Sequence, residues 1–539
     1  MLLKELHALS CDHDAQFLAT MERGSILTCI GVLLILIGIT LSVTWNGILE
    51  YLLNKELRLA PTSKSFTLWQ ETPVPITLEF YFFNWTNPEN LLEENYKANL
   101  VEVGPYIFQE FHEKVNITWN ENHTISYKQI KRWYFDEEKS NGTLKDNITT
   151  LNVVALSATS VSRYRSAFVL VPLSGALRMT GQKIWITKMT GELLFEGYSD
   201  PILTMAVKMP HLAQAKIPAD KFGWFYQRNG SADYEGMYNM ETGAEDISRV
   251  GQLQQWNYDN RTDFYEAECG LVNGSAGELF PPGQTRDKPV QMFSSDLCRS
   301  ISFEYSEDTE VEGIPGYRFV LGKRLVDNGT LDGDNWCNCG GQCVPQGVLN
   351  VSSCRHGAPA FVSYPHFLDA DPYYTRLLNG VMPDASKHRF YLTLEPTTGI
   401  PLDVAARLQI NLLLQPSSHI AMYNDVPTIF FPMMWFEERA TITPELAASI
   451  KLLLMLPVVG LYCALGLILV GVVIIVFSFL PKIMRRNRWS LSHRTRRKQT
   501  DRKPHSVVFT KDCIRPLMSP VEQVSPSPEG TAILGSKAK

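Results

Sequence analysis

The chain has 539 residues, 10 cysteines and 31 prolines, and its formal net charge is -6. Two stretches, 25–45 and 452–480, contain no Asp, Glu, Lys or Arg and are almost wholly apolar, so each is long enough to cross a membrane as a helix. This composition excludes an ordinary soluble enzyme, a collagenous or disordered chain, and a transporter with many spans.

The segment 1–24 carries a net charge of -2 and leads into the first predicted span, 25–45. A cleaved signal peptide is the alternative for this span. The span is longer than the apolar part of a usual signal peptide, however. No basic segment precedes it and no small-residue cleavage site follows it, so we predict an uncleaved anchor. Gly24, Gly31 and Gly38 share one helix face, which favours close approach of another helix, including that of a second copy. Glycine is also common in membrane spans without such a role.

The segment between the spans, 46–451, carries -14, because the whole chain carries -6, residues 1–24 carry -2 and the tail 481–539 carries +10. Ten basic residues of that tail lie between Lys482 and Lys503, so the positive-inside rule places both termini in the cytosol. All ten Asn-x-Ser/Thr acceptors lie between the spans, which predicts a glycosylated luminal or extracellular domain, although any one of them could be an unused surface Asn. The acceptors are Asn84, Asn116, Asn122, Asn141, Asn147, Asn229, Asn260, Asn273, Asn328 and Asn350.

The segment 46–451 favours an α+β fold in which strands predominate, and the absence of repeats or long linkers indicates one domain anchored at both ends. The tail 481–539 is basic at first, and beyond Pro504 it is polar with Ser-Pro pairs, which predicts a disordered segment. Runs of β-branched and aromatic residues predict strands at Pro75 to Phe83, Gly104 to Phe111, Tyr317 to Leu321, Ala360 to Ser363 and Phe390 to Leu394.

One stretch of this domain, 147–191, contains no acidic residue. Its segment from Leu151 to Val171 is predicted as a helix, with Thr149 or Thr150 as N-cap and apolar residues at helical spacing. A basic, partly apolar surface on an acidic protein would concentrate anionic or amphipathic ligands, whereas the alternative is an ordinary helix with solvated arginines. The candidate ligand-binding residues are Arg163, Arg165, Arg178, Lys183 and Lys188.

Six of the ten cysteines lie between the spans. In a cytosolic protein their spacing beside His356 would suggest zinc, but in a glycosylated domain disulfides are the better interpretation, with the pairing left open. Of the other four, Cys11, Cys29, Cys463 and Cys513, only Cys11 suggests acylation, and an inert thiol is the default. The six are Cys269, Cys298, Cys337, Cys339, Cys343 and Cys354.

The sequence contains no catalytic signature: a nucleophile elbow, a zinc-protease helix, a Walker loop and a dinucleotide fingerprint are all missing. Asp327, Asp332 and Asp334 resemble part of a calcium loop, but the closing glutamate is absent, so a solvated turn is the better interpretation. We therefore predict no enzymatic activity, no cofactor, no metal site and no nucleic-acid partner.

Longer runs of sequence resemble a known family. QMFSSDLCRSISFEYSEDTEVEGIPGYRFVLG at 291–322 and HRFYLTLEPTTGIPLDVAARLQINLLLQPS at 388–417 are similar to segments of the class B scavenger receptors. NGSAGELFPP at 273–282, EGYSDP at 196–201 and YPHFLDADP at 364–372 are further matches, and NPENLL and VEVGPYIFQE extend the resemblance to nearly the whole chain. Within this family of fatty-acid translocase and lysosomal integral membrane protein relatives, the chain resembles the epithelial membrane protein type.

The resemblance implies an antiparallel β-barrel-like ectodomain with a helical bundle at its membrane-distal end, which corresponds to about 151–188. It also implies a hydrophobic tunnel for fatty acids, sterols, phospholipids or other lipids, and ligands that include lipoproteins and luminal proteins, for lipid transfer or endocytosis. Arg178 and Lys183 would attract anionic groups at the distal surface. The implied disulfides are Cys269 with Cys337, Cys298 with Cys354, and Cys339 with Cys343.

A two-span ligand-gated ion channel is the competing class, since it shares cytosolic termini and a glycosylated loop. The second span, however, offers only Tyr462, Cys463 and Ser478 as polar residues, without a polar stripe. A membrane-tethered enzyme is disfavoured by the missing signatures. The tail has no tyrosine and only a weak acidic dileucine pattern at Glu529 and 533–534, which favours the plasma membrane over the endosomal or lysosomal membrane.

Overall fold

The computed structural model describes residues 2–209 and 219–496. The chain divides into two compact units, one of residues 39–465 and one that combines 1–38 with 466–539, and each is described by itself. The predicted disordered tail beyond Pro504, with Cys513 and the dileucine pattern, lies outside the described residues, as does the side chain of Cys11.

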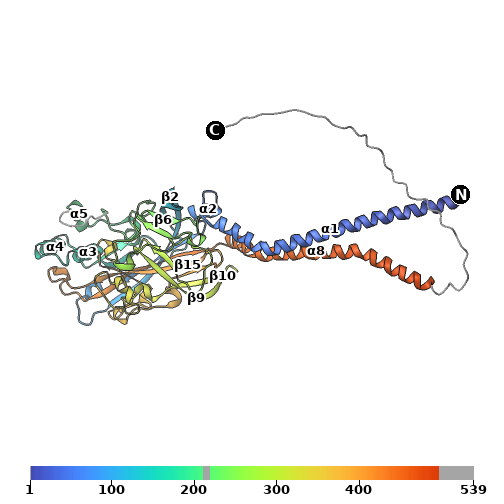
Figure 1. Cartoon of the computed structure of the whole chain (residues 1–539). Coiled ribbons are helices and arrows are strands. Elements are labelled where there is room, and N and C mark those ends of the chain that lie inside the picture. The colour runs from blue at the N-terminus through green and yellow to red at the C-terminus, as the bar shows by residue number, and fades with distance from the viewer. Residues whose placement is uncertain (1, 210–218, 497–539) are drawn as a thin grey trace, which may run out of the picture. The chain divides into compact units, whose positions relative to one another are not determined.

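Strands dominate the unit 39–465, and the helices α3, α4 and α5 gather at one end of them (Figure 1). The helices are α1 (Leu2–Leu57), α2 (Lys64–Gln70), α3 (Val153–Ser162), α4 (Ala167–Met179), α5 (Pro201–Lys208), α7 (Ala385–His388) and α8 (Pro444–Arg496). The strands are β1 (Ile76–Trp85), β2 (Ala98–Trp119), β3 (Thr124–Phe135), β4 (Asn147–Leu151), β5 (Trp185–Met189), β6 (Tyr238–Glu241), β7 (Leu253–Trp256), β8 (Val290–Ser294), β9 (Arg299–Val311), β10 (Ile314–Leu321), β11 (Leu349–Asn350), β12 (Ala360–Ser363), β13 (Leu378–Asn379), β14 (Tyr391–Leu394), β15 (Pro401–Leu414) and β16 (Ile429–Thr441).

Fourteen strands form one sheet, whose main path is β7-β6-β3-β2-β1-β16-β15-β14-β10-β9-β8. All its pairs are antiparallel except that of β13 with β2. The two edge strands approach each other through one segment, because Leu253 N–H donates to the carbonyl of Gly274, and Ser275 forms bridges to both Gln252 and Met292. The sheet therefore nearly closes on itself, which confirms the predicted α+β fold with a large antiparallel, barrel-like sheet.

The five predicted strands are all present, as β1, part of β2, part of β10, β12 and β14. β1 shows why: Leu78, Phe80 and Phe82 alternate along it and are buried in the main core. β2 is much longer than predicted, because Glu110, His112 and Lys114 continue its inner face as buried, paired charges.

The predicted helix from Leu151 to Val171 is wrong in its bounds. Leu151 lies in β4, which pairs with β5, and α3 is capped by Asn152, whose Oδ1 accepts from Ala155 N–H at 3.1 Å. α3 ends where the side chain of Arg163 donates to the carbonyls of Pro416 at 2.8 Å and Gln415 at 3.3 Å. The helix thus ends at a contact with a distant loop, and α4 starts after it.

The helices α3 to α5 lie at the opposite end of the barrel from the start of α8. Ile76, at the start of β1, pairs with Ala440, which lies just before α8. Near the other end of β1, Asn84 Oδ1 accepts from Thr149 N–H of β4 at 2.8 Å, and α3 follows β4 directly. Within 39–465, strand register thus separates the helical end of the barrel from the end where α8 begins.

Two helical stretches are long and apolar enough to span a membrane, Ser25–Leu57 and Pro444–Leu480, and they contain the predicted spans. In the unit of 1–38 and 466–539 they touch at Gly31 and Gly471, where a Cβ on either glycine would lie within 2.8 Å of the other residue's carbonyl oxygen. Thr28 Oγ1 and Ser478 Oγ are 2.8 Å apart on the same contact. Gly31 therefore packs against the chain's own second helix, and oligomerisation stays a prediction.

Candidate functional site

An apolar cavity of about 690 Å³ lies between the helices α3 to α5 and the inner face of the barrel. Ala158 of α3, Leu173 of α4 and Ala206 of α5 line its helical end, and Ile410 and Leu412 of β15 line its wall. This volume is within the range of about 300–1,000 Å³ that is common for pockets holding small organic ligands.

The helix α4 connects this cavity with the protein surface. Phe168 lines the cavity, yet 92% of its surface is exposed. Tyr164, just before this helix, and Met179, its last residue, are exposed to a similar degree. Exposed apolar side chains grouped in this way are typical of interaction surfaces. These exposed residues were not predicted from the sequence, although the uncharged run 166–177 indicates a helix that is apolar on all faces.

The five predicted ligand-binding residues do not form one cluster in the structure. Arg163 and Arg165 lie at the carboxyl end of α3, whereas the carbonyl of Lys183 accepts from the N-cap residue Asn152 at the other end. The ten residues of α3 place these ends about 15 Å apart. Arg178, in the last turn of α4, is about 16 Å along that helix from Ala167, which follows Arg165 by two residues.

Availability for a ligand also differs among these residues. Arg163 is occupied by its two carbonyl partners, and burial lowers the pKa of its guanidinium. Arg165, Arg178 and Lys183 are exposed, and Lys188 lies over the ring of Tyr198 at 4.8 Å. None of the five has a carboxylate within 4.0 Å among residues 2–209 and 219–496, as the acid-free sequence would lead one to expect. Their role in binding stays a prediction.

At its inner end the cavity meets charged side chains instead of apolar ones. Lys131 of β3 lies 3.4 Å from a carboxylate oxygen of Glu110 on β2 and 4.0 Å from one of Glu438 on β16, and all three residues line the cavity. Burial raises the pKa of Glu438, and the charge of Glu110 raises it further. Burial also raises that of Glu110, but Lys131 and His112 outweigh it and hold the pKa of Glu110 at about 2.

Glu110 is also linked to a second set of charged residues. His112 Nε2 lies 2.6 Å from Glu110, and its Nδ1 lies 2.7 Å from Glu278, which also binds Lys114. Burial lowers the pKa of His112, but its two carboxylate partners raise it to about 8. We call Glu110, His112, Lys114, Lys131, Glu278 and Glu438 the charged floor.

The donor atoms of Glu110, His112 and Glu438 lie within 4.8 Å of one another, a spacing that could suit a metal ion. The charges argue against that use. Both ring nitrogens of His112 are engaged by carboxylates, and the ammonium group of Lys131 already lies between Glu110 and Glu438. The floor is therefore an ion-pair network, which agrees with the prediction of no metal site without testing it.

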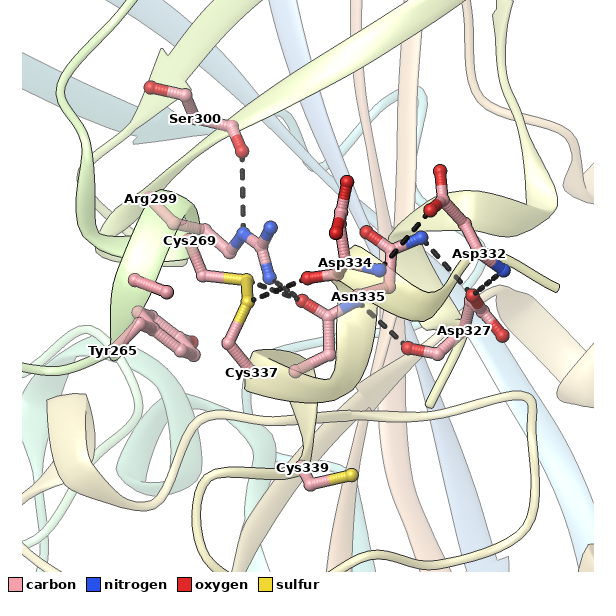
Figure 2. Close-up of a disulfide and its surroundings, with 12 residues drawn as sticks. Tyr265, Cys269, Arg299, Ser300, Asp327, Asp332, Asp334, Asn335, Cys337 and Cys339 are labelled. Atoms are coloured by element: carbon pink, nitrogen blue, oxygen red, sulfur yellow. Dashed lines mark hydrogen bonds between the residues drawn. A yellow bond between two sulfur atoms is a disulfide. The ribbon is translucent and has the colours of Figure 1, made fainter. Parts of the chain in front are cut away.

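The six cysteines between the two apolar helices form three disulfides, Cys269 with Cys337, Cys298 with Cys354, and Cys339 with Cys343. These are the pairs that the resemblance implies. Asp327, beside them, accepts backbone N–H groups from Thr330, Leu331 and Asp332, and these hydrogen bonds lower its pKa against the effect of burial. The suspected calcium loop is thus a closed turn built around Asp327 (Figure 2).

Most of the predicted glycosylation acceptors are exposed or half-buried, but Asn350 is not. It is 7% exposed, and its Nδ2 donates to the carbonyl of Cys339 at 3.0 Å. Glycosylation of Asn350 would therefore require this buried side chain to become exposed. The occupancy of the other nine acceptors stays a prediction.

Comparison with known proteins supports the same family as the sequence resemblance. A sequence model described as the CD36 family matches residues 29–481. The chain belongs to the CD36 family. With the two apolar helices, this membership identifies a two-span membrane protein of the class B scavenger receptor type.

Three CD36-family relatives show how far the similarity extends. The chain is 38% identical over 451 residues to Protein peste of Drosophila melanogaster, covering 83% of this chain and 80% of that protein. It is 32% identical over 461 residues to Scavenger receptor class B member 1 of Bos taurus, covering 84% and 88%. Lysosome membrane protein 2 of Homo sapiens is 33% identical over 427 residues, covering 78% and 87%.

Proposed function

We propose that this protein is a receptor that captures lipids or lipid-bearing particles at the surface of α3 and α4 and takes an apolar ligand into the cavity for transfer. The observation that carries the proposal is the position of α4, whose Phe168 lines the cavity and is exposed at the surface. An acyl chain or sterol bound at that surface would move inside across a single helix.

The energetics favour an apolar ligand. Each CH₂ group taken out of water stabilises the bound state by about 0.8 kcal/mol. The lining of α3, α4 and α5 offers such groups at Val161, Leu173 and Ile202. A chain that stays within the cavity would avoid the cost of exposing this surface to water during transfer.

The basic residues add an electrostatic component to capture. Arg178 and Lys183 have no carboxylate partner among the described residues, so their charges are free to attract anionic head groups or acidic patches of a particle. We further propose the plasma membrane as the site of action, with both termini in the cytosol, on the basis of the charge distribution and the tail sequence.

Filling the cavity tests this function. Full-length glycoprotein purified in detergent should carry a lipid at near-stoichiometric amount, measured by mass spectrometry of the extracted protein. Ala158→Phe and Ala206→Phe place a ring in the cavity and should lower the bound lipid several-fold. Ala167→Phe is the matched control, because Ala167 is an exposed residue of α4 outside the lining.

Two results would contradict the proposal. One is a folded wild-type protein that contains no lipid and takes none up from donor vesicles. The other is an equal amount of lipid in the cavity-filling variants and in Ala167→Phe, which would place the lipid elsewhere. Folding of each variant is checked by its near-UV circular dichroism spectrum.

A further inference from the structure

A second hollow, of about 580 Å³, lies against the strands β8 and β9 and shares no lining residue with the apolar cavity. Two short helical segments, η5 (Lys323–Val326) and η6 (Gly333–Cys339), contribute its other side. Its lining contains four basic residues, Arg286, Lys288, Arg299 and Arg324, and three acidic ones, Asp287, Glu304 and Asp332. We call it the Arg299 pocket.

Arg299 is the buried member of this set, with 8% of its surface exposed. Its Nε donates to the carbonyl of Ser300 at 3.3 Å, its Nη1 donates to Asn338 Oδ1, and its guanidinium lies 5.3 Å from the ring of Tyr265. Figure 2 shows these contacts beside the Cys269 disulfide. Within the part of the chain that the structure describes, Nη2 has no hydrogen-bond partner.

The position of the guanidinium is held by the disulfide-bonded loop. Asn338 lies between Cys337 and Cys339, both of which are in disulfides. Its Nδ2 donates to the carbonyl of Asp327 at 2.8 Å, so its Oδ1 is directed toward Arg299. The free Nη2 is therefore pre-oriented, and ordering it on binding would cost little entropy.

The acidic residues that line the pocket are engaged with other groups. Glu304 and Asp332 lie 3.5 and 3.4 Å from Arg324, and Asp287 is hydrogen-bonded to Thr285. Arg286, at the edge, is paired with Asp308, which does not line the pocket. Across residues 2–209 and 219–496, no carboxylate lies within 4.0 Å of Arg299 or Lys288.

A buried charge without a counterion is costly, and an arginine cannot relieve the cost by losing its proton. Burial lowers the pKa of Arg299, and a charge interaction with Tyr265 opposes the effect only in part. The pocket thus combines a buried cation, a lysine with no carboxylate within 4.0 Å among the described residues, and the polar side chains of Gln291 and Ser302. This combination is complementary to a small anion with several acceptor oxygens.

We propose that the Arg299 pocket is a binding site for an oxyanion, a sulfate, phosphate or carboxylate group that is either free or carried by a sugar. Arg299 Nη2 and the ammonium group of Lys288 are its cationic donors. The site is independent of the lipid cavity, so a ligand of the protein could be recognised through its anionic group while its apolar part is bound elsewhere.

Direct binding tests this site. Full-length glycoprotein in detergent is titrated with radiolabelled inorganic sulfate at constant ionic strength, with inorganic phosphate, acetate and a sulfated monosaccharide as competitors. We expect saturable binding to the wild type and, because one charge-assisted hydrogen bond is lost, about tenfold weaker binding to Lys288→Gln. Competition by the monosaccharide at lower concentration than by free sulfate would indicate a sugar-linked anion.

Two further variants make the result decisive. Arg299→Lys keeps the charge but loses the free Nη2, and it should weaken binding at least as much as Lys288→Gln. Lys387→Gln, an exposed lysine of α7, is the control and should bind as the wild type does. Sulfate binding that does not saturate, or that is equal in Lys288→Gln and Lys387→Gln, would overturn the proposal even if Arg299→Lys fails to fold.

Discussion

The two ends of the apolar cavity are lined by different kinds of side chain. At the helical end, apolar side chains such as Phe168 and Leu173 line the cavity, and part of their surface faces water. At the charged floor, Glu110, His112 and Lys131 are joined by ion pairs of 2.6 and 3.4 Å. We therefore expect the contacts at the helical end to rearrange when a ligand binds, and the ion pairs of the charged floor to stay intact.

The reason lies in what each kind of contact costs when it is broken. An apolar helix that opens loses contacts in proportion to the area it exposes, and a lipid ligand can replace them. A buried charge that loses its partner has no such replacement and carries the full cost of desolvation. Substitutions at the two ends should therefore affect different measurements.

The largest effect on stability is expected at Lys131. Lys131→Met leaves Glu110 and Glu438 without their shared cation and should lower the free energy of unfolding by about 3–5 kcal/mol. Chemical denaturation followed by tryptophan fluorescence measures the loss. Lys128→Met is the control on the same strand, because Lys128 pairs with an exposed Asp233, and its removal should not be detectable.

A second variant shows whether the loss at Lys131 comes from unpaired charge. Glu110→Gln combined with Lys131→Met removes one of the stranded carboxylates and should recover part of the stability. If the double variant is as unstable as the sum of its parts, the floor does not act as one network, and the contrast with the helical end fails.

A smaller, pH-dependent effect is expected at His112. Its pKa of about 8 in the folded protein exceeds the ordinary value near 6.5, so protonation of His112 stabilises the fold below pH 6.5, and this contribution disappears as the pH rises through about 8. The stability lost in His112→Gln should be about 2 kcal/mol greater at pH 6 than at pH 9. An equal loss at the two pH values would show that His112 is not charged in the fold.

At the helical end the expected effect on stability is the smallest. Arg178→Glu combined with Lys183→Glu alters exposed side chains without carboxylate partners among the described residues, so the unfolding midpoint should stay unchanged. Uptake of anionic lipid vesicles by cells that express this variant should fall several-fold at low salt. Lys387→Glu reverses an exposed charge on α7 and is the control. If uptake by the double variant equals uptake by this control, the surface has no part in the proposed function.

Local patterns were enough to predict five of the strands and the two spans. The alternation of Leu78, Phe80 and Phe82 marks β1, and a long uncharged stretch marks each membrane helix. The same reasoning failed for the helix start, because Thr149 and Thr150 are drawn into β4 by pairing with β5, a contact that depends on residues more than thirty positions away. Asn152, the next polar residue, became the cap instead.

The inner face of β2 shows a deeper limit of pattern reading. Hydropathy alone would point Phe111 inward and its neighbours Glu110 and His112 outward, yet Phe111 is 56% exposed and the two polar residues are buried. The orientation is set by partners on other segments, since Lys131 and Glu278 neutralise the charges inside. No spacing within β2 carries that information.

The sequence by itself determined three properties that depend on contiguous residues. These are the membrane spans, the position of every glycosylation acceptor between them, and the similarity to the CD36 family. The tertiary structure alone decided that a cavity lies beneath α4, that Lys131 meets Glu110 and Glu438, and that Arg299 has no carboxylate partner among the described residues. The physical reason is that hydropathy acts along the chain, whereas the balance of a buried charge depends on strands brought together by register.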